Sequence, residues 1–526
     1  MSRDFDIAVV GSGFAGSLFA LIARRVGRSV ILIEKGTHPR FAIGESSSPL
    51  ANLLLEELCD RYDLPRIKPL AAWGTWRRAY PDIACGLKRG FTFYAHRAGE
   101  RFAADPERRD QLLVAASPHD EVADTHWYRA DFDHFLLREA RAAGAEYLDQ
   151  TNLERFLPLS NGAALEGSRR GRRVSLTARF VLDASGPRGF LQRALGLPEA
   201  AFRGLPPTQG LYTHFEGVER LDEMGLFASP DRPPYPVDDA AVHHVLENGW
   251  IWVLRFGNGV VSGGVAAAPR LANQMAFGDG AAAWERLLSL YPTVREQFAR
   301  ARPVLPFVHA ALLPFRSRVV TGSPWALLPS AAAFVDPLLS TGIPLALLGV
   351  QWLAEAVERD WDRASFEPAL GRYAASTLAD ADATALLIAA LYAAFSDFEL
   401  FSALCLLYFA AASFTEAAHR LGRPELAGSF LLRDHPVFGL ALRGCCEQVL
   451  ESQARGGLTG LARSRLMAKI QKAIEPLDVA GLTRTSRRNW HPVEAGPLLD
   501  AAHKLGATGE EIQGMLERSG FFPEAA

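Results

Sequence analysis

Short apolar runs and one longer apolar segment alternate in the first forty residues. An apolar run at residues 7–10 ends at a glycine-rich turn, a longer apolar segment follows, and a second run, "SVILIE", ends at Glu34. Short runs bounded by turn signals predict buried strands, and the longer segment predicts a helix. The pattern therefore predicts a strand–helix–strand unit of the doubly wound α/β kind.

The turn inside this unit has the GxGxxG spacing of a dinucleotide-binding loop. The first glycine permits the tight turn, the second lets a pyrophosphate approach the backbone, and the third lets helix and strand pack closely. The helix N-terminus offers free N–H groups to phosphates, and the acid after the second strand can accept hydrogen bonds from a ribose. The alternative is a glycine-rich turn without a ligand. We expect cofactor contacts from Gly11, Gly13, Phe14, Ala15, Gly16, Glu34 and Lys35.

Helical and strand patterns continue along the chain. Phe132, Phe135, Leu136 and Ala140 have helical spacing after Arg129, and "ARFVLDASGPRG" reads as a strand that ends in a polar turn. Trp250 and Trp252 alternate on an expected strand, so both should face one side. A break near residue 375 should begin a helix-rich tail that contains one probable loop, "TRTSRRNWHPVEAGP", and a final helix capped by Thr508 with Glu511.

Composition narrows the classes of protein. The 526 residues are 49% hydrophobic and 22% charged with a net charge of −3, which suits a soluble globular protein and gives no electrostatic grip on nucleic acid. Asp397 and Glu399 interrupt the most apolar late stretch, which favours a buried or interface helix over a membrane span. The cysteines show no metal-ligand spacing, and with no signal peptide they favour a reducing cytoplasm: Cys59, Cys85, Cys405, Cys445 and Cys446.

The order of these elements resembles FAD-dependent monooxygenases of the hydroxybenzoate-hydroxylase type. That resemblance implies that Arg129 lies near the FAD phosphates or ribose, and that Asp183 and Gly186 lie near the dinucleotide. For Arg129, an ion pair with Asp131 or Asp133 at the surface is the alternative.

Four further motifs, in order, resemble the flavin-dependent halogenases of the tryptophan-halogenase-like family: "IGESSSP", "GLKRGFTFY", "GWIW" and "FVDPLLSTGI". The resemblance covers residues 1 to about 375. It implies an α/β fold in which residues 1–200 and 300–375 form a Rossmann-like FAD-binding domain. Residues 200–300 with part of 70–130 would form an inserted mixed β-sheet that contacts substrate, and residues 376–526 a helical C-terminal extension.

The resemblance also implies roles for single residues. Lys88 matches the catalytic lysine that captures hypohalous acid, which reduced FAD forms from oxygen and chloride or bromide. An apolar pocket would lower its pKa, whereas the alternative is a surface lysine or a pair with Glu45. Thr341 and Gly342 would contact halide at a helix N-terminus, with Ser340 as its cap. Further contacts to FAD would come from Glu45, Ser46, Asp336, Gly342 and Ile343, and the substrate passage from Trp250, Trp252 and Ser340.

Three departures from the family pattern shape the expected activity. Trp252 is followed by Val253-Leu254-Arg255 where the family usually shows any residue followed by Ile-Pro, Pro329-Ser330 replaces a Gly-Asp pair, and Leu339 replaces the acid of free-tryptophan halogenases. A phenol or pyrrole, free or tethered to a carrier protein, is therefore the expected substrate. Hydroxylation on the same scaffold is the alternative activity, and a flavin-binding assembly or sensor protein is the third reading. With a single dinucleotide fingerprint, the chain should receive reduced FAD from a separate reductase.

Overall fold

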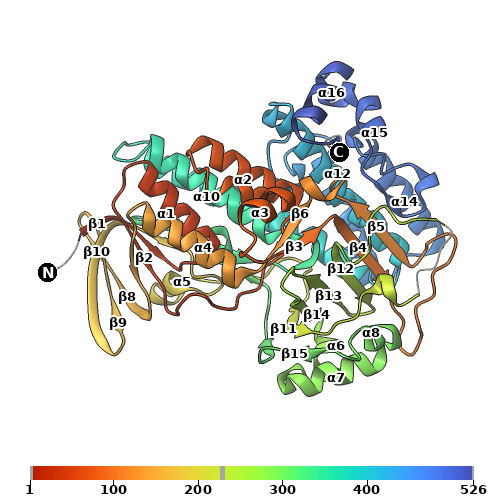
Figure 1. Cartoon of the computed structure of the whole chain (residues 1–526), viewed down its shortest axis with the longest axis horizontal. Helices are drawn as coiled ribbons and strands as arrows, with labels where there is room; N and C mark the ends of the chain where they lie inside the picture. Colours follow the sequence, from red (N-terminus) through yellow and green to blue (C-terminus); the bar gives the residue numbers. More distant parts are fainter. Residues whose placement is uncertain (1–3, 226–230, 524–526) are drawn as a thin grey trace.

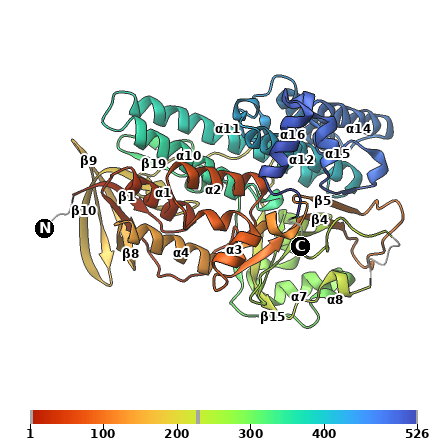
Figure 2. The same cartoon turned by 45° about the horizontal axis from the view of Figure 1, so that its top comes forward.

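Two large β-sheets form the body of the molecule. The computed structural model describes residues 4–225 and 231–523 of the chain, and within these residues the sheets contain eight and nine strands. Figure 1 shows the first sheet on the left, with β1 and β2, and the second on the right, with β4, β5 and β11–β15. The helices of the C-terminal part lie along one side of both sheets (Figure 2).

The first sheet carries the predicted strand–helix–strand unit. β1 (Asp4–Val10) and β2 (Val30–Ile33) are parallel neighbours joined by α1 (Phe14–Arg25). β1 also pairs in parallel with β10 (Arg172–Asp183). The strand expected from "ARFVLDASGPRG" therefore lies beside the first strand of the chain. The remaining strands are β7 (Glu146–Leu148), β8 (Thr151–Leu159), β9 (Gly162–Arg169), β18 (Thr321–Gly322) and β19 (Trp325–Leu327).

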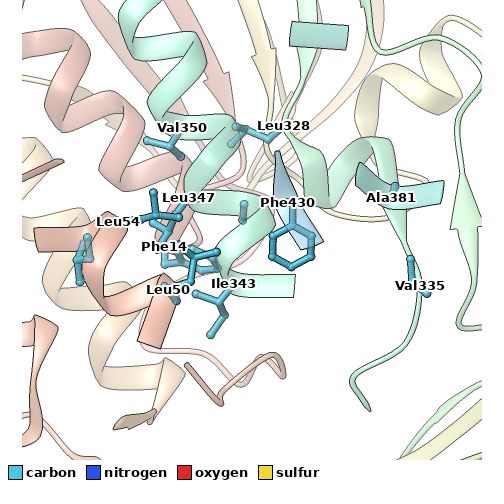
Figure 3. Packing of buried hydrophobic residues seen from close by; sticks show 14 of the residues in the cluster. Phe14, Leu50, Leu54, Leu328, Val335, Ile343, Leu347, Val350, Ala381 and Phe430 are labelled. Atoms are coloured by element: carbon cyan, nitrogen blue, oxygen red, sulfur yellow. The ribbon is translucent and has the colours of Figure 1, made fainter. Parts of the chain in front are cut away.

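Helices from distant parts of the chain pack together against this sheet. α4 (Arg129–Ala142) buries Phe132, Phe135, Leu136 and Ala140, which confirms the helical spacing read from the sequence. Figure 3 shows Ile343 and Leu347 of α10 beside Phe14 of α1 and Leu50 of α2 within one buried cluster. The bounds of these two further helices are Pro49–Arg61 for α2 and Gly342–Arg359 for α10.

The second sheet is mixed and mostly antiparallel. Its order is β15-β11-β14-β13-β12-β4-β5-β21, with β16 beside β11. α7 (Ala281–Leu290) and α8 (Pro292–Gln297) cover one face and α12 (Phe398–Arg420) covers the other (Figure 1). The strands are β4 (Gly90–Ala95), β5 (Gln111–Ala115), β11 (Gln209–Glu216), β12 (Ala241–Leu246), β13 (Gly249–Arg255), β14 (Val261–Ala267), β15 (Arg302–Pro303), β16 (Val308–Ala310) and β21 (Trp490–His491).

Two small sheets and several short helices connect these bodies. β3 (Cys85–Lys88) pairs with β6 (Asp124–Trp127), and β17 (Phe315–Arg316) pairs with β20 (Ala333–Phe334). The short helices are α3 (Trp73–Ala79), α5 (Phe190–Ala194), α6 (Pro269–Met275) and α9 (Pro329–Ala332).

The C-terminal part is mainly helical, with two differences from the sequence prediction. α11 runs without interruption from Phe366 to Ala393, so the break expected near residue 375 is wrong; the chain instead breaks at residues 394–397, where Asp397 caps α12. The expected loop at 483–497 contains β21, which joins the edge of the second sheet beside β5. The remaining helices are α12 (Phe398–Arg420), α13 (Phe438–Ala454), α14 (Gly460–Ile474), α15 (Ala495–Asp500) and α16 (Gly509–Arg518), the last with the predicted Thr508–Glu511 capping box.

Three of these helices are long and apolar enough to cross a membrane by length and composition: Leu338–Arg359, α11 and α12. Asp397 caps α12 and lies outside the helix, and Glu399 lies in its first turn. Contrary to the expectation from the sequence, these two acidic residues therefore do not argue against a membrane span. Inside the fold, 61%, 56% and 78% of their most apolar windows are buried. The prediction of a buried helix at α12 is therefore confirmed, and packing within the protein accounts for the apolar composition.

Candidate active site

A cavity of about 590 Å³ lies where the first sheet meets the second. We call it the dinucleotide cavity. Its wall brings together fifteen of the residues that the sequence singled out: Gly13, Phe14, Ala15, Gly16, Glu45, Ser46, Arg129, Gly186, Trp250, Trp252, Asp336, Ser340, Thr341, Gly342 and Ile343. Segments up to about three hundred residues apart thus converge on one space.

The glycines of the turn have the geometry that a dinucleotide requires. Gly11 has a φ of +102°, and a Cβ there would lie 2.6 Å from the carbonyl oxygen of Ala184. A Cβ on Gly16 would lie 2.1 Å from the carbonyl oxygen of Gly11, so this glycine lets α1 approach the turn. At Gly13 the nearest atoms to a Cβ are side-chain atoms at 3.6 Å or more, from Arg129 and Asp133. The turn is therefore tightly packed at Gly11 and Gly16 and open at Gly13, which fits a bound pyrophosphate.

The acid after β2 lies behind the turn. Glu34 is buried and accepts hydrogen bonds from the backbone N–H of Ser12, at 3.0 Å, and of Gly36, at 2.9 Å. Arg40 approaches the same carboxylate at 3.4 Å, and these contacts together hold the pKa of Glu34 below its usual value, against the effect of burial. Lys35 is exposed. Arg40 lines the cavity beside Gly13, and the motifs gave no signal for it.

Arg129 is a buried cation at the mouth of the glycine turn. It forms a two-bond ion pair with Asp133, at 2.7 and 2.8 Å, and donates to the backbone carbonyls of Ile43 and Gly44. The predicted alternative of an ion pair is thus present, but it is buried and faces the cavity rather than solvent. A guanidinium held in this way is preorganised for a phosphate.

Asp183 and Gly186 occupy the turn after β10. The Asp183 carboxylate accepts from the backbone N–H groups of Ser185, at 2.9 Å, and Leu191, at 2.6 Å. It therefore shapes this turn and the start of α5, while Gly186 lines the cavity. A direct contact from either residue to a cofactor stays a prediction.

Asp336 joins three elements at the inner wall. Its buried carboxylate accepts from Trp250 Nε1 at 3.2 Å, from Tyr392 Oη at 2.8 Å, and from the backbone N–H of Leu338 at 3.0 Å. Burial raises its pKa to about 6, and these three donors act in the opposite direction. Tyr392 belongs to α11, so the C-terminal helices fix the position of a tryptophan in the proposed passage.

The turn before α10 differs from the capping arrangement that we expected. Leu339 and Ser340 both have left-handed backbones, with φ of 64° and 55°, and α10 begins at Gly342 with Thr341 as N-cap and no side-chain cap bond. The prediction of Ser340 as the helix cap is therefore wrong. Its hydroxyl lies instead 3.5 Å from Lys88 Nζ. A Cβ on Gly342 would meet no atom within 4 Å, so this end of α10 is open to the cavity.

Lys88 is fully buried behind this turn. Its Nζ donates to Ser46 Oγ at 2.9 Å and to the backbone carbonyl of Ser47, and it lies 3.8 Å from the centre of the Phe91 ring. The surface-lysine alternative is wrong, and so is a pair with Glu45, which hydrogen bonds His214 at 2.7 Å. The Lys88 amine therefore lies next to Ser46 and Ser340, which line the dinucleotide cavity, and next to the ring of Phe91.

Asp124 is the charge that faces Lys88. The two residues are directly opposite in the β3–β6 pair, and Asp124 is held by Asn52 Nδ2 at 2.9 Å. Burial lowers the pKa of Lys88 to about 7, although the Asp124 carboxylate acts to raise it. Burial likewise raises the pKa of Asp124 to about 7. Sequence reasoning missed Asp124, because cross-strand pairing over this distance in the chain has no local signal.

Aromatic rings form a continuous row from the dinucleotide cavity toward Lys88. Trp250 and Trp252 face the same side of β13, as predicted, with ring centres 5.6 Å apart. His243 lies 5.2 Å from Trp250 and 4.3 Å from Phe93, which in turn stacks 6.4 Å from Phe91. Burial lowers the pKa of His243 to about 3, so this imidazole is neutral and packs as an aromatic ring.

Comparison with known proteins agrees with this geometry. The family model of FAD-dependent oxidoreductases matches residues 6–322. The chain is 29% identical over 409 residues to monodechloroaminopyrrolnitrin halogenase PrnC of Pseudomonas fluorescens, covering 76% of this chain and 70% of that protein. It is 29% identical to tetracycline 7-halogenase of Kitasatospora aureofaciens, over 65% of this chain and 61% of the relative.

A solved halogenase, PltM in complex with phloroglucinol and FAD, has the same fold. It superposes with a TM-score of 0.78 at 24% identity and covers 92% of this chain and 99% of that one. The alignment extends far beyond the dinucleotide unit and includes much of the C-terminal part. The chain belongs to the FAD-dependent oxidoreductase family, and the relatives and the solved structure to which it is similar are flavin-dependent halogenases.

Proposed function

We propose that this chain is a two-component halogenase in which Lys88 transfers an oxidised halogen from the dinucleotide cavity to an electron-rich aromatic ring. The observation that carries the proposal is the position of Lys88 Nζ, which is buried between the serines of that cavity and the ring of Phe91. An amine in this place can receive hypohalous acid from one side and present the halogen to the other.

The residues of the glycine turn fit FAD. Gly13 would offer its bare backbone to the pyrophosphate, and the guanidinium groups of Arg40 and Arg129 would lie beside the phosphates. Reduced FAD, when bound, would react with oxygen and so supply the oxidant that converts chloride or bromide to hypohalous acid. The described residues contain a single strand–helix–strand unit of the dinucleotide kind, so we propose that a separate reductase delivers the reduced flavin.

The start of α10 is the proposed halide contact. The backbone N–H groups of Thr341 and Gly342 lie at the positive end of an 18-residue helix and at the wall of the cavity. This arrangement would hold a halide ion at this end of the cavity. Trp250 and Trp252 line the same cavity and keep the space beyond it apolar.

The chemistry at Lys88 needs a neutral amine. The lone pair of Nζ attacks the halogen of hypohalous acid, and an N–halogen bond forms as the oxygen–halogen bond breaks. The departing hydroxide takes one proton from the amine and leaves as water. The aromatic ring then attacks this halogen, a carbon–halogen bond forms as the N–halogen bond breaks, and the ring proton returns to the amine through the surrounding hydrogen bonds. Burial lowers the pKa of Lys88 and so increases the neutral fraction of this amine.

A product screen tests this function. We expect the purified protein with FAD, a flavin reductase, oxygen and chloride or bromide to give halogenated phenols or pyrroles, detected by mass spectrometry. Lys88→Ala should abolish these products and retain FAD binding, whereas Lys68→Ala, at an exposed lysine, should match the wild type. Halide-independent gain of one oxygen would instead identify a hydroxylase, and FAD binding without turnover a non-catalytic flavoprotein.

A further inference from the structure

A second cavity, of about 170 Å³, lies where the C-terminal part covers the second sheet. We call it the aromatic cavity. The sheet contributes Phe91 and Val114, α12 contributes Tyr408 and Phe409, and α16 contributes Met515. An engineered apolar cavity of roughly 150 Å³ is large enough to hold benzene. The aromatic cavity therefore has room for one aromatic ring and its small substituents.

This apolar space contains polar side chains that lack partners within the protein. His491 is 5% exposed and Ser117 is 4% exposed, and in the described residues neither ring nitrogen of His491 nor the hydroxyl of Ser117 has a hydrogen-bond partner. Buried polar atoms in folded proteins are almost always paired. Both residues line the cavity, so a ligand with a polar group would supply the missing hydrogen bonds.

A carboxylate and a guanidinium lie at the same wall. Glu416 and Arg420 are one turn apart on α12, and Arg420 Nε donates to Glu416 Oε1 at 2.9 Å. A ring hydroxyl can donate a hydrogen bond to the carboxylate and also accept one from the guanidinium, whereas an N–H group can only donate. An anionic ligand would meet repulsion from Glu416.

Lys88 does not line this cavity, but it contacts one residue of the cavity wall. Phe91 forms part of its wall, and the same ring lies 3.8 Å from Lys88 Nζ. Asp124 interacts electrostatically with Lys88 and also with Glu416 and Arg420. A ring bound beside Phe91 is therefore near the amine that would carry the halogen.

We propose that the aromatic cavity is the substrate site and that it takes a single uncharged aromatic ring bearing a hydroxyl group, with the hydroxyl bound by Glu416. This inference rests on the proposed function, because it assumes that Lys88 presents the halogen. Hydrogen bonding of the hydroxyl to a carboxylate increases the electron density of the ring, which supports its attack on the halogen. The aromatic cavity thus offers the carboxylate of Glu416, whereas Leu339 stands where free-tryptophan halogenases carry an acid.

Binding measurements on the FAD-loaded protein, without halide or reductant, test the site separately from catalysis. The probes are resorcinol, its dimethyl ether 1,3-dimethoxybenzene, and benzoate, measured by isothermal titration calorimetry. We expect resorcinol to bind at least tenfold more tightly than either of the other two. Glu416→Gln and Ala412→Phe, which fills the cavity, should each weaken resorcinol at least tenfold with FAD binding unchanged.

Glu399→Gln is the matched control, since Glu399 is on the same helix but pairs with Arg463 outside the cavity. It should bind resorcinol as the wild type does. Resorcinol affinity that is unchanged in both cavity variants, or equal affinity for the dimethyl ether, would overturn the site even if Lys88→Ala abolishes halogenation. If Lys88→Ala still halogenates while the cavity variants lose resorcinol binding, the proposed function is overturned and the assignment of the binding site stands.

Discussion

The two cavities on either side of Lys88 are built in different ways. The dinucleotide cavity takes part of its wall from the backbone of consecutive residues, Gly13 to Gly16, and from the start of α10. The aromatic cavity takes its wall from side chains of α12, α16, β5 and the loop after β21. Backbone geometry suits a ligand that is shared by a whole family, whereas side chains from separate elements can change one at a time.

This difference assigns separate tasks to the two parts of the chain. Residues near the first sheet hold the flavin and the halide in our proposal, and the C-terminal part sets which ring reaches Lys88. Asp336 couples the two, because its carboxylate binds Trp250 of the second sheet and Tyr392 of α11. Variants on each side should therefore have separable effects.

The largest effect is expected from Gly11→Ala. Its φ of +102° is unfavourable for alanine, and the added Cβ would lie 2.6 Å from the carbonyl oxygen of Ala184. We expect FAD affinity, followed by flavin fluorescence, to fall more than about 100-fold, because the turn must open to accommodate the methyl group. Gly371→Ala, in α11 with open space around it, is the control and should bind FAD normally. Unchanged FAD affinity in Gly11→Ala would contradict the cofactor assignment.

A smaller effect is expected from Tyr392→Phe, which removes a donor from a buried carboxylate. Loss of a hydrogen bond to a charged group costs about 1.5–3 kcal/mol of unfolding free energy. The comparison is Tyr373→Phe, which removes a hydrogen bond to the backbone carbonyl of Leu327 and should cost about 1 kcal/mol. Urea denaturation measures both. Equal losses in the two variants would show that Asp336 is not a charged acceptor and would weaken the proposed coupling.

The smallest effect is expected from Asp124→Asn, in the pH dependence of halogenation. The carboxylate favours the charged form of Lys88, so its removal should lower the pKa of the amine below about 7. If neutral Lys88 is the reactive form, the rate rises with pH through this pKa, and the midpoint should move by about 1 unit toward lower pH. Asp82→Asn, at an exposed carboxylate, should leave the profile in place. A midpoint that moves to higher pH would contradict the proposed form of the amine.

Sequence reasoning predicted the first of the two cavities much better than the second. The glycine turn, β1, α1 and β2 are consecutive, so local pattern defines them, and the buried position of Lys88 followed from its motif. The pairing of Lys88 with Asp124, and of β5 with β21, joins residues far apart in the chain and has no local signature. The left-handed backbone at Leu339 and Ser340 likewise depends on surrounding contacts, which is why the expected Ser340 cap failed.

The central claim is that Lys88 itself carries the halogen between the two cavities. Single-turnover reactions with reduced FAD, oxygen and bromide, without an aromatic substrate, followed by peptide mass spectrometry, test it most directly. We predict one bromine in place of one hydrogen on the peptide that contains Lys88, and none there in Lys88→Ala. Bromine spread over exposed lysines such as Lys68, with none on Lys88, would contradict the account.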